Sequence, residues 1–460
     1  MDDFGDACTA VAAALAVDEL NGSARLWVGC SGGLDSMVLL DALAASVPAK
    51  RIAVVHINHQ LSSNADRWQQ VVATRAEQLG CQFQAHTVAC QATGKGVEAA
   101  ARQARYAVFE SLLGEGDLLL LGHHADDQLE TLLYRLLRGA GLRGLAAMPA
   151  RRSLGRGALW RPLLNLPRQT LEHYAARRQL SWVDDESNAS EQFDRNYLRQ
   201  QVTPPLRQRW QQWHLPLART TAHLREGDQL LTELATIDLQ SCSVRGENGG
   251  YSLSIALLEQ LAPHRQRNML RYWPERAVGV GLASTAELDE LYTAILGARD
   301  DAQPQLFGQG YCWRRFAGRL YMLAASGGNE PLAEYSLSWP LHTLPARLSL
   351  PDGSVLVATA AETAVGVEPL LRGDLKQLSV RPREPGVRSR PVGRQSSAPI
   401  KNIFQEQAVA PWLRTSTPLL WSGEQLVAVG GLWIEADSAA PAGQAGIKIV
   451  HNSPCQPFSE

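Results

Sequence analysis

Two absences limit the kinds of protein that this sequence can specify. Its seven cysteines are widely spread and form no C-x-x-C pair, so the sequence supports neither a disulfide framework nor a zinc or iron–sulfur site. No window approaches 18 consecutive apolar residues, which argues against a membrane-spanning helix. The N-terminus, M-D-D-F-G-D, lacks the positive charge of an export signal. We therefore expect a cytoplasmic protein with no membrane partner.

Formal charge is nearly balanced overall but not along the chain. The 460 residues together carry −2, whereas residues 131–220 hold 15 Lys+Arg against 6 Asp+Glu, and residues 371–460 hold 10 against 7. Acidic stretches separate these two basic zones. Such asymmetry suggests a polyanionic partner contacted at two places, although solvated helix faces produce it as well.

The first 135 residues alternate apolar runs with helical patterns. The predicted strands cover residues 26–30, 51–59, 82–88 and 118–124, and the helices between the later strands cover residues 64–79 and 97–113. This alternation specifies an α/β fold with a doubly wound parallel sheet and helices on both faces. Ligands of such sheets bind beyond the carboxyl ends of the strands. The segments Ser31–Ser36 and His123–Asp127 each follow a strand, so we expect them to converge on one crevice.

The pattern changes after Pro205. Long helical stretches such as residues 222–239 and 255–272 predict a small helical domain, and β-rich runs at residues 354–359 and 425–434 predict a mixed α+β domain. The glycine pair in A-S-G-G-N-E, residues 325–330, marks a boundary. The expected domains are therefore 1–215, 216–330 and 331–460, in line with about 100 to 200 residues per domain.

The segment S-G-G-L-D-S, Ser31–Ser36, lies between a predicted buried strand and a predicted helix. Glycines permit close approach of a ligand to the backbone, and a helix N-terminus attracts anions. The segment lacks the lysine of a Walker A loop and the spacing of a dinucleotide-binding G-x-G-x-x-G. We predict that backbone amides and both serine hydroxyls hold pyrophosphate, with Asp35 available to Mg²⁺. A plain glycine turn with a serine cap is the alternative.

The segment G-H-H-A-D-D-Q-L-E-T, residues 122–131, joins a predicted strand to a predicted helix. Asp127 and Glu130 are three residues apart and therefore share a helix face. Two carboxylates at such a place suit a divalent cation held together with nucleotide phosphates. Ordinary capping of the first helical turn by Asp126 or Asp127 is an equally good interpretation.

Together the two motifs resemble the PP-loop ATP pyrophosphatases, and within them the tRNA(Ile)-lysidine synthase family. Six further segments are similar to that family in order and spacing. They are H-I-N-H-Q-L (56–61), G-V-E-A-A-A-R-Q-A-R-Y (96–106), R-G-A-G-L-R-G-L (138–145), R-P-L-L (161–164), D-E-S-N-A-S-E-Q-F-D-R-N-Y-L-R (185–199) and I-K-N-I-F-Q-E-Q-A-V-A-P-W-L-R-T-S-T-P-L-L (400–420). The resemblance spans nearly the whole chain.

The resemblance implies a two-step ligation that uses ATP and Mg²⁺. ATP adenylates the C2 oxygen of the wobble cytidine in a tRNA(Ile) with a CAU anticodon and releases pyrophosphate. The amine of free L-lysine then displaces AMP. The product, lysidine, pairs with A rather than G, which changes decoding from AUG to AUA. The implied partners are this tRNA and lysine, and a homodimer is a further option.

The resemblance also implies roles for particular residues. The residues implied in ATP binding are Ser31, Gly32, Gly33, Leu34, Asp35 and Ser36. Those implied in catalysis are Asp35, Asp127, Glu130 and Arg105, with Asp35 also holding Mg²⁺ through the phosphates. Those implied in tRNA binding are Arg195, Asn196, Arg199, Arg388, Arg394 and Lys401. Arginine forks suit phosphates, although a solvated helix face is the alternative for any single arginine.

Three other functions fit parts of the same pattern. A tRNA thiolase on this loop typically needs cysteine pairs, and an amidotransferase-type synthetase needs a cysteine nucleophile motif or a glutaminase domain. The sequence shows neither feature. A non-catalytic RNA-binding protein would keep only the fold. Against that reading, Asp35 and the acidic pair Asp127 and Glu130 are all present.

Overall fold

A computed structural model gives the fold of the chain. It describes residues 3–15, 25–60, 62–88, 97–184, 194–247, 250–299, 302, 304–324, 335–362, 369–441 and 443–452. The predicted boundary at 325–330 and residues 185–193 of the arginine-bearing motif lie outside this description. The chain divides into two compact units, Met1–Gln229 and Leu230–Glu460. The finer division into three domains stays a prediction.

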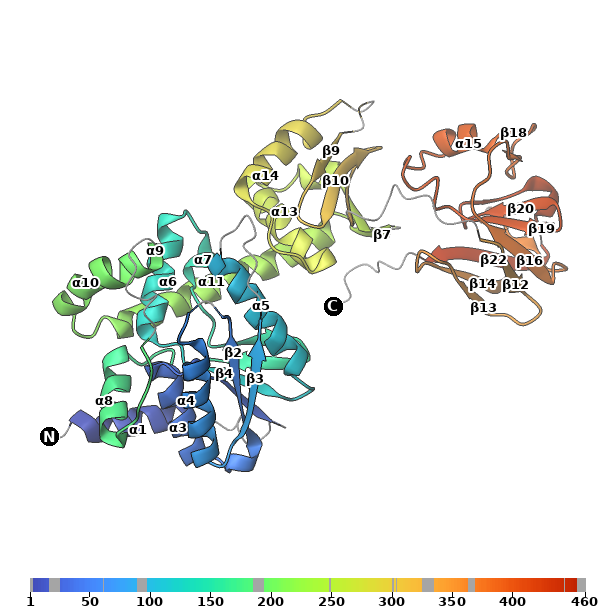
Figure 1. The fold of residues 1–460 in the computed structure, drawn as a ribbon. Helices are drawn as coiled ribbons and strands as arrows, with labels where there is room; N and C mark the ends of the chain where they lie inside the picture. Colours follow the sequence, from blue (N-terminus) through green and yellow to red (C-terminus); the bar gives the residue numbers. More distant parts are fainter. Residues whose placement is uncertain are drawn as a thin grey trace. The chain divides into compact units, whose positions relative to one another are not determined.

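The first unit is built on a six-stranded sheet in the order β3-β2-β1-β4-β6-β5 (Figure 1). Its strands are β1 Leu26–Gly29, β2 Ile52–Asn58, β3 Gln82–Thr87, β4 Leu118–Leu121, β5 Arg151–Leu154 and β6 Gly157–Trp160. Neighbouring strands pair in parallel except at the antiparallel β5–β6 edge. β1 and β4 are far apart in sequence but adjacent in the sheet. The segments that follow these two strands therefore meet at one edge, as predicted.

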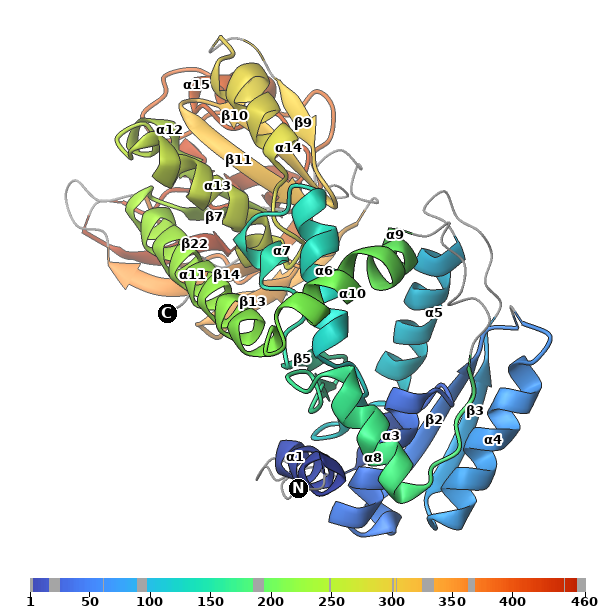
Figure 2. The same ribbon diagram turned by 90° about the vertical axis from the view of Figure 1, so that its left-hand side faces the viewer.

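Helices cover both faces of this sheet, which confirms the predicted fold class. The helices packed on it are α1 Asp3–Leu15, α3 Leu34–Ser46, α4 Ala65–Gln78, α5 Val97–Leu112 and α8 Arg168–Arg178. The chain also forms α6 Ala125–Leu137, α7 Leu142–Leu145, α9 Asp194–Tyr197, α10 Thr203–Arg209 and α11 His214–Ser241, the last of which crosses the boundary between the two units. Successive residues of β1 point to opposite faces: Val28 packs with α1, α3, α4 and α8, and Trp27 packs with α5. Figure 2 shows α8 alongside α3. Burial on both faces explains the continuous apolar runs.

The part of the second unit that we expected to be helical also contains a five-stranded antiparallel sheet, in the order β7-β8-β11-β10-β9. Its elements are β7 Arg245–Glu247, β8 Gly250–Ser254, α12 Ile255–Leu258, α13 Pro263–Val278, α14 Thr285–Glu290, β9 Gln305–Phe307, β10 Tyr311–Phe316 and β11 Arg319–Ala324. The sequence hid this sheet because its strands are three to six residues long. The single helix expected over residues 255–272 is two helices, since Pro263 favours a new helical start.

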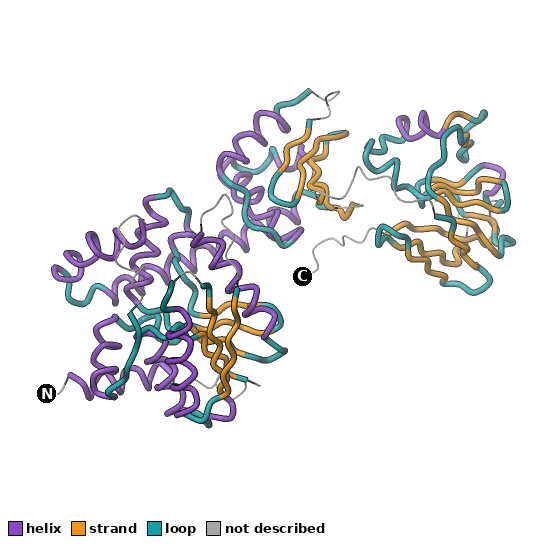
Figure 3. The backbone as a smooth tube through the Cα atoms, viewed as in Figure 1, coloured by secondary structure: helices purple, strands orange, loops and turns teal. Residues whose placement is uncertain are grey.

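The described remainder of the second unit has two larger sheets, a two-stranded sheet of β17 and β18, and a short helix (Figure 3), which confirms the predicted mixed α+β region. One sheet has the order β12-β16-β19-β20-β21 and the other β13-β14-β22-β15. The elements are β12 Leu337–Pro340, β13 Ala346–Ser349, β14 Val355–Glu362, β15 Leu371–Arg372, β16 Gln377–Arg381, β17 Arg388–Ser389, β18 Ala398–Pro399, α15 Ile400–Glu406, β19 Leu419–Ser422, β20 Gln425–Val429, β21 Trp433–Ile434 and β22 Ala445–Asn452. Over the described ranges, no helix has both the length and the apolar character needed to cross a membrane.

Candidate active site

The loop between β1 and α3 has the geometry of an anion-binding site. Gly32 takes φ +93°, which favours glycine, and a Cβ there would lie 3.0 Å from the Val183 side chain. Gly33 precedes α3, and no described side chain caps this helix, so its first-turn amides can face an anion. The Ser36 hydroxyl donates to the Gly33 carbonyl at 2.9 Å and lies 3.3 Å from the Ser31 hydroxyl. The serine cap considered as an alternative is therefore not formed.

The ends of β1 and β4 approach each other closely. A Cβ on Gly122 would lie 2.7 Å from the backbone oxygen of Asp35, so only glycine leaves room for the loop at this point. Beyond it, the His124 Nε2 atom lies 3.5 Å from the nearest carboxylate oxygen of Asp35 and 3.5 Å from that of Asp127. The two sequence motifs therefore converge on one place, as the predicted topology required.

A buried imidazolium, His124, lies at the centre of this cluster. Its side chain is 2% exposed. Burial alone would lower its pKa, but the carboxylates of Asp127, Asp126 and Asp35 outweigh that effect and raise the pKa to about 10. His124 is therefore positively charged at neutral pH and offsets part of the negative charge of the cluster. No role for this histidine was predicted from the sequence, and its place directly before the two aspartates was the available signal.

The acidic pair is held by two arginines. Arg199 Nε lies 2.7 Å from Glu130 Oε1, and Arg199 Nη2 lies 3.3 Å from Asp127 Oδ1. Arg195 makes longer contacts, 3.3 Å to Glu130 and 3.4 Å to Asp127. The other Asp127 oxygen accepts the backbone N–H of His124 at 3.0 Å. Asp127 therefore caps α6 through one oxygen and contributes negative charge to the site through the other. Both the capping and the site interpretation apply to it.

Arg195 and Arg199 thus lie on the carboxylates, although we predicted them as tRNA contacts. They come from α9 and from the π-helical turn that follows it, Leu198–Val202. Their side chains remain 35% and 32% exposed, so they border the site instead of being enclosed by it. Asn196 lies between them on α9 and is half-buried. A tRNA contact by these three residues stays a prediction.

Asp126 has a different role from its neighbour. It is 4% exposed, it accepts the backbone N–H of Arg168 at 2.8 Å, and it pairs with Arg207. Its carboxylate therefore ties α6 to the start of α8 and to the last turn of α10. Burial would raise its pKa, but hydrogen bonds from His124 and from the Arg168 backbone lower the pKa to about 2. This position gives Asp126 a structural role between helices.

Asp126→Asn is expected to destabilise the chain by about 2 kcal/mol at pH 7. The folded-state pKa of about 2 lies below the unfolded value of about 3.9. The carboxylate therefore contributes its full stability above about pH 4 and loses it as the pH falls toward 2. Thermal unfolding of the full chain at pH 7, 5 and 3.5 checks this. The variant should melt lower by the same margin at pH 7 and 5, and a margin that widens at pH 3.5 contradicts the assignment.

The loop and the cluster open into a pocket of about 520 Å³. Of the predicted ATP-binding residues, Ser31, Gly33, Leu34, Asp35 and Ser36 line it, and Gly32 lies beneath against Val183. Of the predicted catalytic residues, Arg105 and Asp127 also line it, whereas Glu130 is buried and does not line it. Arg168, which nothing in the local sequence distinguishes from other arginines, lines the pocket as well, and its Nη1 atom lies 3.9 Å from Asp35.

One buried polar atom in this pocket fits a metal ion. Asp35 Oδ1 is buried and has no hydrogen-bond partner among the described residues. Mg²⁺ does not need a cage of protein ligands, because it usually binds through one or two carboxylates together with substrate phosphates. The described residues contain no cluster of three metal-ligating side chains. The Asp35 carboxylate therefore suits a cation that binds together with the phosphates of a substrate.

The other predicted tRNA contacts belong to the second unit. Arg388 donates to the Ser397 carbonyl at 2.7 Å, and Arg394 pairs with Glu406. Lys401 is exposed on α15. None of these three residues lines the pocket described above.

Comparison with known proteins agrees with this geometry. Three families match the chain: a PP-loop domain over residues 9–206, a "TilS substrate binding domain" over residues 253–321 and a "TilS substrate C-terminal domain" over residues 378–451. Relatives named tRNA(Ile)-lysidine synthase include those of Pseudomonas fluorescens, 40% identical over 89% of this chain and 90% of the relative, and Coxiella burnetii, 36% identical over 91% of each. A third, from Serratia proteamaculans, is 39% identical over 93% of this chain and 95% of the relative.

The sheet order, the uncapped glycine loop and the matched domain define a PP-loop nucleotide-binding protein. The relatives extend this beyond the first unit, because they align along about nine-tenths of the chain. The chain belongs to the tRNA(Ile)-lysidine synthase family.

Proposed function

We propose that this chain ligates free L-lysine to C2 of the wobble cytidine in tRNA(Ile) with a CAU anticodon and consumes ATP to AMP and pyrophosphate. The observation that carries the proposal is the convergence of an uncapped anion-binding loop and Asp127, one member of the acidic pair, at one pocket. The names and the alignment of the relatives support the choice of substrate. A non-catalytic RNA-binding protein would have no need of this charge arrangement.

The first step places the pyrophosphate of ATP on the loop. Negative charge builds up on the leaving pyrophosphate as the C2 oxygen attacks the α-phosphorus. The first-turn amides of α3 and the Ser31 hydroxyl would donate to it, and the Ser36 hydroxyl would do so in place of its bond to the Gly33 carbonyl. Mg²⁺, held by Asp35 through the phosphates, would neutralise part of this charge. Arg105 and Arg168 line the same pocket and supply further positive charge.

The second step needs a place for the lysine ammonium. Asp127 and Glu130 offer two carboxylates, but in this structure both are occupied by guanidinium groups. Arg195 makes the longer contacts and Arg199 the shorter ones. We therefore infer that Arg195 leaves the carboxylates when lysine binds and turns to a tRNA phosphate. Arg195 would then make the observed ion pair before lysine binds and the predicted tRNA contact afterwards.

The experiment that tests this function measures two signals in parallel, pyrophosphate release from ATP and incorporation of labelled lysine into unmodified tRNA(Ile). We expect both, and both should require the tRNA. Release without lysine incorporation would reject lysine as the second substrate. No release from folded protein with Mg²⁺ present would favour the RNA-binding alternative.

Glu130→Gln is expected to impair the addition of lysine and to leave pyrophosphate release nearly unchanged. Loss of a charge-assisted hydrogen bond is worth about 1.5–3 kcal/mol, so the lysine KM should rise by about tenfold or more. Pyrophosphate release at saturating tRNA should stay within about twofold, because Glu130 does not line the pocket. Glu172→Gln is the matched control, since Glu172 pairs with Arg168 on the surface and is 51% exposed. Equal loss of both signals would contradict the lysine assignment.

The basic residues predicted in the second unit complete the proposal. We propose that Arg388, Arg394 and Lys401 contact tRNA phosphates, because arginine and lysine side chains supply the sequence-independent part of nucleic-acid affinity. Support comes from the match of residues 378–451 to a substrate C-terminal domain. The cytoplasmic location and the homodimer stay predictions from the sequence.

A further inference from the structure

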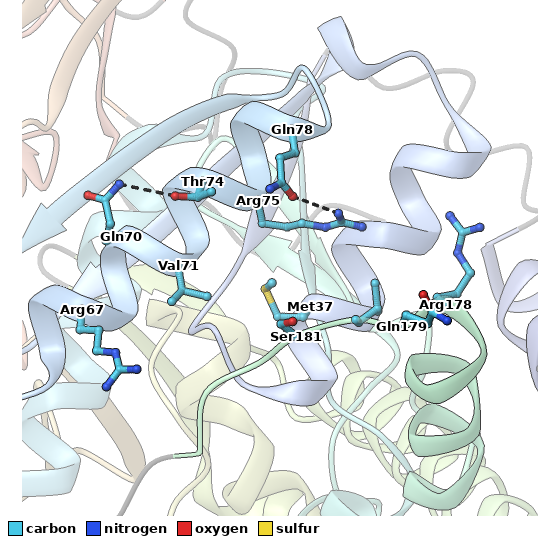
Figure 4. A pocket seen from close by; sticks show the side chains of 11 residues that line it. Met37, Arg67, Gln70, Val71, Thr74, Arg75, Gln78, Arg178, Gln179 and Ser181 are labelled. Carbon is cyan, nitrogen blue, oxygen red and sulfur yellow. Dashed lines mark hydrogen bonds between the residues drawn. The ribbon is translucent and has the colours of Figure 1, made fainter.

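The first unit has a second groove, of about 400 Å³, that lies outside the catalytic pocket. It runs between α4 and the segment 179–181 that follows α8 (Figure 4). The two pockets have no lining residue in common. None of the roles assigned above uses this groove.

Positive charge dominates the groove. Three arginines line it, Arg67, Arg75 and Arg178, and no acidic residue does. Arg75 and Arg178 share one carboxylate, Asp41, which is 1% exposed and lies 2.5 Å and 2.9 Å from their guanidinium nitrogens. One carboxylate balances one of these two charges. Arg67 is exposed and has no ion-pair partner among the described residues, so the groove keeps a net charge of about +2 at neutral pH.

The charges lie at two separate ends. Figure 4 shows Arg67 at one end of the groove and Arg75 with Arg178 at the other, with Met37 and Ser181 between them. A single small anion would contact only one end, and a cation such as lysine would be repelled. The arrangement suits a ligand with two anionic groups joined by a body that makes apolar contacts and hydrogen bonds. Two successive phosphates of a ribonucleotide strand have this chemistry.

We propose that the groove between α4 and residues 179–181 binds two phosphate groups of the tRNA strand, outside the catalytic pocket. The inference rests on the proposed function, which supplies the tRNA. A free nucleotide or pyrophosphate has the same phosphate chemistry and is the other source of such a ligand.

The groove is also connected to the catalytic loop. Two residues beyond Ser181, the backbone N–H of Val183 donates to the Gly32 carbonyl at 3.0 Å. Val183 and Asp184 then line the catalytic pocket. An RNA strand bound in the groove would therefore lie beside the segment containing Val183, which supports the anion-binding loop. This location places the bound tRNA next to the ATP site without using any residue of that site.

The test compares Arg67→Gln with Arg177→Gln in the full chain. Arg177 is exposed on α8, one residue from Arg178, and does not line the groove, which makes it the matched control. The Kd for unmodified tRNA(Ile) is measured by filter binding between about 50 and 200 mM salt, without ATP or lysine. Arg67→Gln should weaken binding by about threefold to tenfold and reduce the slope of log Kd against log salt by about 0.7–0.9, the value of one phosphate contact. Arg177→Gln should change neither quantity.

A second arm separates the two sources of phosphate. Equilibrium dialysis with pyrophosphate counts the equivalents bound per chain. If Arg67→Gln removes one equivalent and leaves tRNA binding unchanged, the tRNA-strand proposal is overturned and the groove is a site for free phosphates. Equal behaviour of the two variants in both arms overturns the site altogether. If the native chain binds no tRNA, the proposed function fails, and the pyrophosphate arm still reports on the groove.

Discussion

Asp35→Asn is expected to lower tRNA-dependent pyrophosphate release by about 100-fold or more. The substitution keeps the size of the side chain and removes its charge. Asp35 is the only carboxylate that belongs to the anion-binding loop among its described residues, and its Oδ1 atom is buried without a hydrogen-bond partner. In the proposed mechanism, losing the charge would remove the protein's hold on a phosphate-bound cation, at the point where charge develops in the first step.

Asp35→Asn should slow pyrophosphate release without lowering the thermal stability of the chain. Asp35 contributes only part of the charge around His124, because Asp126 and Asp127 lie at 3.6 Å and 3.5 Å from the ring nitrogens. The thermal midpoint should therefore change little. Single-turnover pyrophosphate release at saturating ATP is the measurement, with Asp289→Asn, at an exposed ion pair of the second unit, as the control. A variant with normal release would rule out Asp35 as the metal-holding residue.

Gly122→Ala is expected to have the second largest effect, because it adds one methyl group where two loops touch. The new Cβ would lie 2.7 Å from the Asp35 oxygen and 2.9 Å from the Asp35 carbonyl carbon. Both are backbone atoms, so either the end of β4 or the loop itself must shift. Overpacking of this kind costs about 1–3 kcal/mol. A displacement of about 1 Å in a positioning element can cost about 100-fold in rate.

Thermal unfolding and pyrophosphate release, measured on the same preparation, test this prediction. Gly281→Ala is the control, since a Cβ at Gly281 meets no atom within 4 Å. We expect Gly122→Ala to lose stability and activity together and the control to keep both. Normal activity in a stable Gly122→Ala variant would show that the two segments need not be as close as the structure places them.

Much of this architecture could be predicted from local patterns. The alternation of apolar runs and helices is regular enough to give the parallel sheet, and the edge shared by Ser31–Ser36 and Asp127 follows from strand order. The five-stranded sheet of the second unit could not be predicted in the same way. Its strand β10, Tyr311–Phe316, is only six residues long and carries two consecutive arginines, so neither a period of two nor an apolar run appears.

The carboxylates of Asp126 and Asp127 show most clearly what could not be predicted from the sequence. Asp126 and Asp127 are adjacent in sequence and equally acidic, and capping of the first helical turn fitted either of them. In the structure, consecutive residues at a helix start point in different directions. Asp126 therefore meets Arg168 and Arg207, while Asp127 meets His124, Arg195 and Arg199.

The sequence by itself determined the class of fold, the family resemblance and the residue types of the site, because these depend on local periodicity and on motifs within a few residues of one another. Only the tertiary structure decided which charges pair, that His124 is held as an imidazolium and that Arg195 and Arg199 occupy the acidic pair. Burial, distance and direction set those outcomes, and each depends on segments that fold together from distant parts of the chain.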